Sequence, residues 1–187
     1  MICIINFGSL KTEKIGACLK KLGYSFEIFA WNELKKKDWE KAEGIILSGA
    51  PVLLTKTNTE IYTERFEFLK TLAIPVLGIC FGHQLLGLLF GANVFLGDEV
   101  RTETEISITS ANILFNDFGK KVKMMEDHTE GINLPAPFIK LASSEKYETE
   151  AMKHSILNIF GVQFHPEVSG EEGLKLLNNF CKLTRGN

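Results

Sequence analysis

Short apolar runs alternate with amphipathic segments over the first two-thirds of the chain. The runs have the length and composition of strands buried on both faces of a sheet, and they lie at Met1–Phe7, Ser25–Ala30, Gly44–Leu47 and Pro75–Ile79. Helical spacing of apolar residues follows at residues 9–22, 59–72 and about 83–90. Ser9 is expected to cap the first of these helices, with Leu10 and Ile15 on its apolar side. The alternation predicts an α/β fold with a mainly parallel central sheet and helices on both faces.

After Gly91 the apolar runs become shorter and the turns between them closer. Strands are predicted at 92–96, 105–109, 113–115, 122–125, 139–142, 149–152 and 159–164, and a closing helix at 170–183. These strands are expected to add a mixed or antiparallel part to one edge of the sheet. Because no repeat, low-complexity segment or linker interrupts the pattern, residues 1–187 are predicted to form a single domain.

Composition and charge exclude several classes of function. Hydrophobic residues make up 45% of the chain and charged residues 24%, as in an ordinary soluble globular protein. The net charge of −2 gives no basic field for nucleic acid, and no apolar run has the length of a membrane span. The opening residues do not form a secretory signal, so the expected location is the cytoplasm.

One cysteine stands apart from the other three. The four cysteines form no C-x-x-C pair, so neither a zinc knuckle nor a redox dithiol is predicted. Cys80 lies in the sequence Gly78-Ile79-Cys80-Phe81-Gly82, where a predicted strand passes into a predicted helix. A strand-to-helix turn of this kind presents a nucleophile, and the helix N-terminus beneath it favours a thiolate. By itself, the same cysteine is also consistent with a small packed residue.

A thiol nucleophile requires a base, and the base requires an orienting group. Among the four histidines, His165 lies at the end of a predicted strand with Glu167 two residues later. Pro166 disfavours helix at the preceding residue, so extended backbone is expected to place His165 and Glu167 on one side. By itself this motif is also typical of a surface turn. Two such motifs at strand ends of one α/β sheet favour a Cys–His–Glu site.

The segments GICFGHQ at Gly78–Gln84 and GVQFHPEV at Gly161–Val168 together resemble the class I, or triad-type, glutamine amidotransferases. A third segment, IILSGAP at Ile45–Pro51, is similar to the strand and oxyanion loop of that family. The resemblance covers essentially the whole chain and implies a flavodoxin-like mixed sheet, glutamine as substrate and no cofactor.

The resemblance also implies roles for individual residues. Cys80 is the expected nucleophile, His165 the base and Glu167 the group that orients it. The expected oxyanion donors are the backbone N–H groups of Phe81 and of the loop formed by Gly49 and Ala50. Gln84 is expected to help hold the glutamine head group. No metal is expected, and the sequence pattern indicates no cluster of metal ligands.

Within the family, the chain is most similar to the amidotransferase parts of GMP synthases. The resemblance then implies that ammonia from glutamine is used to convert XMP to GMP. The chain contains neither a G-x-x-x-x-G-K-[ST] phosphate loop nor an ATP-pyrophosphatase signature, so a separate ATP-pyrophosphatase subunit is the expected partner. The chain departs from the family pattern at Leu10-Lys11, Ala50, Gly97–Glu105 and Ser169–Glu171.

Other interpretations are compatible with the same residues. The chain could be a stand-alone γ-glutamyl hydrolase, an amidotransferase subunit of another pathway, or a regulatory module without turnover. The polar stretch His128–Glu130 is interpreted either as a contact to the partner subunit or as an exposed loop.

Overall fold

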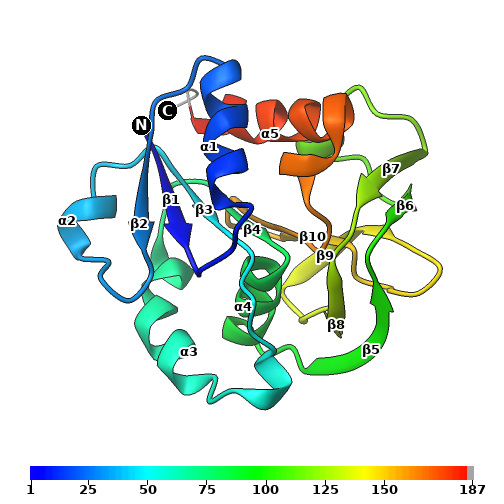
Figure 1. The fold of residues 1–187 in the computed structure, drawn as a ribbon, viewed down its shortest axis with the longest axis horizontal. Helices are drawn as coiled ribbons and strands as arrows, with labels where there is room; N and C mark the ends of the chain where they lie inside the picture. Colours follow the sequence, from blue (N-terminus) through cyan, green and yellow to red (C-terminus); the bar gives the residue numbers. More distant parts are fainter. Residues whose placement is uncertain (185–187) are drawn as a thin grey trace.

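The computed structural model describes residues 1–184, and a nine-stranded mixed sheet crosses the whole molecule (Figure 1). The strand order is β2-β1-β3-β4-β11-β10-β9-β6-β7. The parallel half contains β2 (Phe26–Ala30), β1 (Ile2–Asn6), β3 (Gly44–Leu47), β4 (Val76–Ile79) and β11 (Ile159–Val162). The antiparallel half contains β10 (Ala151–His154), β9 (Phe138–Ser143), β6 (Glu103–Ile108) and β7 (Lys121–Met125). The predicted mixed sheet with an antiparallel addition at one edge is therefore confirmed.

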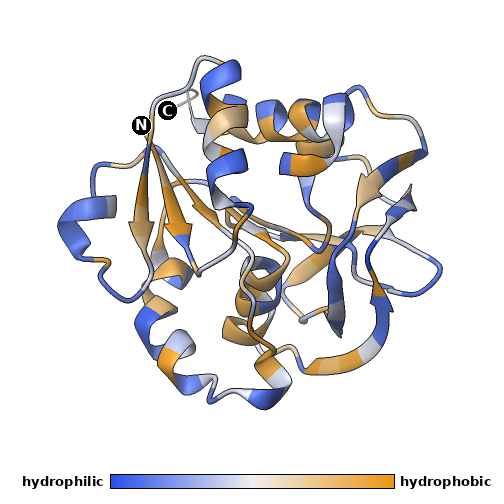
Figure 2. Cartoon of the chain, viewed as in Figure 1, coloured by the Kyte–Doolittle hydropathy of each residue, from blue (hydrophilic) through white to orange (hydrophobic). Residues whose placement is uncertain are grey.

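Helices cover both faces of the sheet, as predicted. Strand β1 shows why, because its residues are apolar on both sides: Ile2 and Ile4 belong to one core cluster and Cys3 and Ile5 to the other. The first cluster is completed by α1 (Thr12–Lys21) and α5 (Gly170–Thr184). The second is completed by α3 (Glu60–Phe66) and α4 (Phe81–Leu89). Figure 2 shows apolar strands between helices whose outer sides are polar.

The remaining elements are short helical segments and a separate pair of strands. Helix α2 (Lys36–Trp39) and four 3₁₀ turns, η1 (Leu54–Lys56), η2 (Glu67–Thr71), η3 (Ile113–Phe115) and η4 (Pro166–Val168), connect the larger elements. Strand β5 (Val94–Val100) pairs with β8 (His128–Ile132) in a separate two-stranded sheet. No helix within residues 1–184 combines the length and the hydrophobicity of a bilayer-crossing segment.

Several sequence predictions of local structure are wrong. Residues 113–115 form a 3₁₀ turn instead of a strand, because Asn112 caps the turn through its side-chain oxygen, which accepts from the N–H of Leu114 at 3.1 Å. The apolar run there reflects packing, since Leu114 and Phe115 belong to the core. The predicted helix at 59–72 changes to a 3₁₀ turn after Phe66.

The start of the first helix also differs from the prediction. Helix α1 begins at Thr12, and Ser9 belongs to the turn before it, where its side-chain oxygen accepts from the N–H of Lys11 at 3.1 Å. Leu10 is 96% exposed, so it is not part of the apolar side of the helix. This turn follows β1 at the carboxyl edge of the sheet, and it places Leu10 and Lys11 beside a cavity.

Helix α4 lies directly against the backbone of β3 and β4. A Cβ atom added at Gly78 would lie 2.4 Å from the carbonyl oxygen of Gly82, and one added at Gly82 would lie 2.6 Å from Leu47. No real Cβ atom tolerates such distances, so glycine at both positions permits the close approach. The two glycines around Cys80 therefore set the position of the helix that follows it.

Replacing Gly78 by alanine should destabilise the fold, since the new methyl group meets backbone that has no flexible end to move. We expect Gly78→Ala to lower the free energy of unfolding by about 1–3 kcal/mol. Gly119→Ala is the matched control, because the nearest atom to its Cβ is 3.9 Å away, and its effect should stay within about 0.5 kcal/mol. Denaturant unfolding of both variants measures the difference, and equal stabilities would contradict the role given to the two glycines.

Candidate active site

A cavity of about 780 Å³ opens at the carboxyl ends of the parallel strands. Loops after β1, β3, β4 and β11 contribute to its wall, together with the segment that joins β7 to β8. Open α/β sheets bind their ligands at this edge. Cys80 and His165 both line the cavity, so the structure brings together two predicted residues that are 85 positions apart in the sequence.

Cys80 occupies the predicted turn between β4 and α4. Its φ of +53° and ψ of −105° are a strained conformation for a residue with a side chain. The turn is held from behind, because the N–H of Cys80 donates to the carbonyl oxygen of Val162 in β11 at 2.9 Å. Helix α4 begins at Phe81, the next residue, so the sulfur lies at the positive end of the helix dipole.

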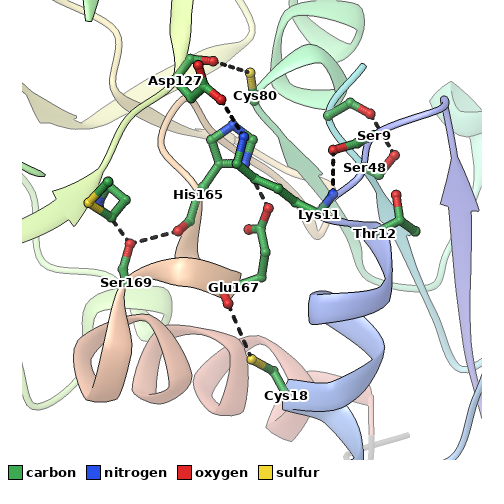
Figure 3. A network of polar contacts seen from close by, with 12 residues as sticks. Ser9, Lys11, Thr12, Cys18, Ser48, Cys80, Asp127, His165, Glu167 and Ser169 are labelled. Carbon is green, nitrogen blue, oxygen red and sulfur yellow. Dashed lines mark hydrogen bonds and ion pairs between the residues drawn. The ribbon is translucent and has the colours of Figure 1, made fainter. Parts of the chain in front are cut away.

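His165 and Glu167 form a buried pair beside Cys80 (Figure 3). The Nδ1 atom of His165 lies 2.7 Å from Oε1 of Glu167, and both side chains are almost completely buried. The predicted extended backbone is wrong at this point. Strand β11 ends at Val162 and Glu167 lies in the 3₁₀ turn η4, because Pro166 occupies the first position of that turn. The turn brings the carboxylate back onto the imidazole.

His165 is positioned by backbone contacts as well as by Glu167. The backbone N–H of His165 donates to the carbonyl oxygen of Met125 at 2.8 Å, and its carbonyl oxygen accepts from the Ser169 hydroxyl at 2.7 Å. The same Ser169 oxygen accepts from the N–H of Met125 at 2.9 Å. Ser169, one of the departures from the family pattern, therefore joins the end of β7 to the turn that carries the histidine.

The electrostatics of the pair favour a charged imidazole. Burial lowers the pKa of His165, but the hydrogen bonds with Cys80 and Glu167 and the charges of both groups raise it, to about 10. At neutral pH the ring is therefore an imidazolium next to the sulfur.

The segments that carry the predicted oxyanion donors lie beside Cys80. Phe81 provides the first N–H of α4, and the first N–H groups of a helix have no acceptor within it. Ala50 and Phe81 line the cavity, and Gly49 lies so close that a Cβ there would be 3.2 Å from the His165 ring. The carbonyl oxygen of Ser48 accepts from the N–H of Gly82 at 3.2 Å, which fixes the loop to the helix. The role of these N–H groups as oxyanion donors stays a prediction.

Gln84 lines the cavity, but its amide nitrogen already has partners within the protein. The Nε2 atom donates to the carbonyl oxygen of Glu130 at 2.9 Å and to Oε1 of Gln163 at 3.1 Å. These bonds join α4 to β8 and to the loop that follows β11. The structure therefore gives Gln84 an anchoring position, and its predicted contact with glutamine stays a prediction.

A charged cluster at the mouth of the cavity was not predicted from the sequence. Nζ of Lys11 lies 2.5 Å from one oxygen of Asp127, and Nε of Arg101 lies 3.5 Å from the other. The hydrogen bond from Lys11 lowers the pKa of Asp127. The Asp127 carbonyl oxygen also accepts from the thiol of Cys80 at 4.0 Å (Figure 3). Lys11 and Arg101 both lie in segments that depart from the family pattern. That departure is the only feature of the sequence that points to the charged cluster.

The exposed-loop interpretation of His128–Glu130 is wrong. These residues begin strand β8, and the side chains of His128 and Glu130 are buried in the wall of the cavity. The Glu130 carboxylate accepts from the N–H groups of Leu54 and Thr55, both at 2.8 Å, and so fixes the turn that follows the loop of residues 50–53 in the cavity wall. Most of the segment is therefore inaccessible to a protein partner.

The structure also forms a cluster of metal-type ligands that the sequence pattern does not indicate. Glu126, His128 and Glu150 each offer one ligand atom, and these atoms all lie within 4.8 Å of one another. Glu126 and His128 are close in sequence, but Glu150 joins them only because β10 and β7 belong to the same folded sheet. No spacing rule connects residues brought together in this way.

The family model of the class-I glutamine amidotransferases matches residues 3–183. The chain belongs to that family. It is 38% identical to the glutamine-hydrolysing subunit of GMP synthase from Pyrococcus furiosus, over 98% of both chains. The subunit of the same name from Methanocaldococcus jannaschii is 34% identical, over 98% of this chain and 97% of the relative.

Solved structures agree with this membership. A crystal structure from Thermoplasma acidophilum, assigned to a GMP synthase subunit, superposes with a TM-score of 0.86 at 26% identity. The match covers 98% of this chain and 93% of the other. A glutamine amidotransferase structure from Thermotoga maritima shows the same fold, with a TM-score of 0.82 at 21% identity, over 100% of this chain and 98% of the other.

The raised pKa of His165 predicts a pH-dependent contribution to stability. A group whose pKa is higher in the folded state stabilises the fold fully below its unfolded pKa, here about 6.5, and the effect is lost as the pH rises through about 10. Glu167→Gln removes the carboxylate charge that stabilises the imidazolium form of His165. The melting temperature of the wild type should therefore exceed that of the variant most below pH 6.5, and the gap should narrow towards pH 10.

Thermal unfolding of both proteins across this pH range measures the gap. Glu171→Gln is the matched control, because it removes an exposed carboxylate from the first turn of α5 only a few residues away. A gap that is constant with pH, or one that the control reproduces, would contradict the assignment of the shift to the pair of His165 and Glu167.

Proposed function

We propose that the chain hydrolyses glutamine to glutamate and ammonia through Cys80, His165 and Glu167. The observation that carries this proposal is the geometry of the three residues, with Cys80 on a strained turn at a helix N-terminus beside a buried imidazolium–carboxylate pair. Membership of the glutamine amidotransferase family supports it. The intact site also argues against a regulatory module without turnover.

In the first step, the Cys80 sulfur attacks the side-chain carbonyl carbon of glutamine. The carbonyl oxygen becomes negative, and the N–H groups of Phe81 and of the Gly49–Ala50 loop are proposed to stabilise it. His165 gives a proton to the departing nitrogen, which leaves as ammonia, and a γ-glutamyl thioester stays on Cys80. Because Glu167 holds Nδ1, the other ring nitrogen is directed to the sulfur and the leaving group.

In the second step, water replaces ammonia. The now neutral His165 takes a proton from the water molecule, whose oxygen attacks the thioester carbon. The tetrahedral intermediate again places its negative oxygen at the same N–H donors. It then collapses, glutamate leaves and Cys80 regains the thiolate, so the imidazolium–thiolate pair is restored.

The ammonia is proposed to serve a separate ATP-pyrophosphatase subunit that converts XMP to GMP. Support comes from the relatives named as glutamine-hydrolysing subunits of GMP synthase, which this chain matches over almost the full length of both. Free ammonia is protonated in water at neutral pH, so its use requires a closed path from the cavity to the synthetase. The exposed Leu10 at the mouth of the cavity is compatible with a contact there.

Replacing the nucleophile should remove turnover without unfolding the protein. Cys80→Ala keeps the Cβ atom but has no sulfur, so glutamate release should fall by about a thousandfold or more. Cys18→Ser is the control, because Cys18 lies on α1 outside the cavity wall. Its thiol donates to the backbone carbonyl oxygen of Glu167 at 3.8 Å, and a serine hydroxyl keeps a donor at that position. Release of glutamate by Cys80→Ala at more than a trace would show that another residue is the nucleophile.

A second experiment tests the pathway. Glutamate and GMP are measured with glutamine alone and after addition of a GMP synthase ATP-pyrophosphatase subunit, XMP and ATP. We expect glutamate release to increase with the complete mixture and GMP to form. Release only from γ-glutamyl peptides would favour a stand-alone hydrolase, and glutaminase activity without GMP would favour another acceptor. No release in any mixture contradicts the proposed hydrolysis itself.

A further inference from the structure

Glu126, His128 and Glu150 meet behind the wall of the cavity, and the proposed mechanism uses none of them. Glu126 follows β7, His128 begins β8 and Glu150 precedes β10. Their exposed fractions are 1%, 8% and 0%. Carboxylates are rarely buried to this degree unless they are paired or bind a metal, so two of them in one interior cluster require an explanation.

Hydrogen bonding orients the His128 ring. Its Nδ1 atom lies 2.9 Å from the carbonyl oxygen of Glu130, and a carbonyl oxygen only accepts, so Nδ1 carries a hydrogen. The Nε2 atom faces Oε2 of Glu126 at 2.5 Å. At this distance a proton lies between the two atoms, and a divalent ion bound by both groups would take the place of that proton.

The unpaired oxygens of the two carboxylates are a second, independent feature of the cluster. Oε1 of Glu126 and Oε2 of Glu150 are fully buried and have no hydrogen-bond partner within residues 1–184. The other oxygen of Glu150 accepts from the Ser144 hydroxyl at 2.7 Å, which holds the carboxylate in place. Two carboxylates, each with an unpaired oxygen, thus lie beside the Nε2 atom of His128. The backbone contact at Nδ1 fixes the orientation of that ring.

We propose that Glu126, His128 and Glu150 bind one divalent metal ion of the zinc type. One imidazole nitrogen and two carboxylate oxygens are ligands that zinc takes, and a water molecule completes a tetrahedral site. Tetrahedral zinc keeps its ligand atoms roughly 3.4 Å apart, so the pair at 2.5 Å must separate by roughly 1 Å, and the other ligand atoms, all within 4.8 Å, need movements of similar size. The carbonyl bond to Nδ1 is the kind of outer contact that orients metal-bound histidines.

A second cavity, whose lining does not include Cys80, reaches Glu126. It has a volume of about 490 Å³ and lies between β6 and the turn at residues 144–146. The ion would therefore reach the cluster without passing through the glutamine cavity. Bound there, it would join the β7–β8 segment to the residue before β10. Asp127, whose carbonyl oxygen accepts from the Cys80 thiol, lies between two of the ligands.

The experiment uses the whole chain, treated with a chelator, dialysed and then titrated with Zn²⁺ alone. Calorimetry and elemental analysis are expected to show one equivalent bound per chain, and the melting temperature should rise with Zn²⁺. Glu150→Gln, which keeps the shape of the side chain, should weaken binding at least tenfold, and Glu126→Gln should do the same. Glu148→Gln is the matched control, since Glu148 is two residues away and its side chain is 84% exposed.

Co²⁺ gives a second readout that surface binding does not reproduce. A tetrahedral Co²⁺ complex absorbs visible light, and this absorption should be present in the wild type and in Glu148→Gln and absent in Glu150→Gln. If the wild type does not bind one equivalent of metal ion, the proposal is overturned. The three side chains are then held together by shared protons. Equal binding by Glu150→Gln also overturns the proposal, because the metal then lies elsewhere. Neither result depends on glutaminase activity, so the proposed hydrolysis is tested separately.

Discussion

Helix α4 packs on strands β3 and β4 with no side chain between the backbones at Gly78 and Gly82, and the site is arranged around that contact. Because of this contact, the turn between β4 and α4 must be very tight. Cys80 forms that turn and has a positive φ. Surrounding structure must maintain a strained residue of this kind. The N–H of Cys80 bonded to β11 and the N–H of Gly82 bonded to the loop after β3 supply that support.

The antiparallel half of the sheet is part of the same arrangement. The end of β7 holds His165 through backbone hydrogen bonds, and Ser169 links the two segments again. The β7–β8 segment also brings Asp127 over the sulfur. In the sequence, the strands of the antiparallel half look like an addition to a parallel core. In the structure, they position His165 and close one side of the cavity.

The sequence was sufficient for the parallel core because its signals are local. Apolar runs such as Gly44–Leu47 and the turn at Cys80 depend on neighbouring residues, and the structure has both as predicted. Strand β8 was not predicted, since its buried polar residues His128 and Glu130 carry no apolar alternation. Their burial depends on partners distant in the sequence, such as the backbone of Leu54 and Thr55.

The place of β11 in the sheet has a consequence for how the chain folds. This strand begins at Ile159, near the end of the chain, yet it lies between β4 and β10 in the middle of the sheet. The two halves of the sheet thus cannot join until β11 has been synthesised, and the join is a parallel pairing between residues more than 80 positions apart. Pairings of such long range form slowly, because the entropy of closing the loop is lost before the contacts form. A nascent chain therefore carries its cysteine for some time before it acquires the histidine.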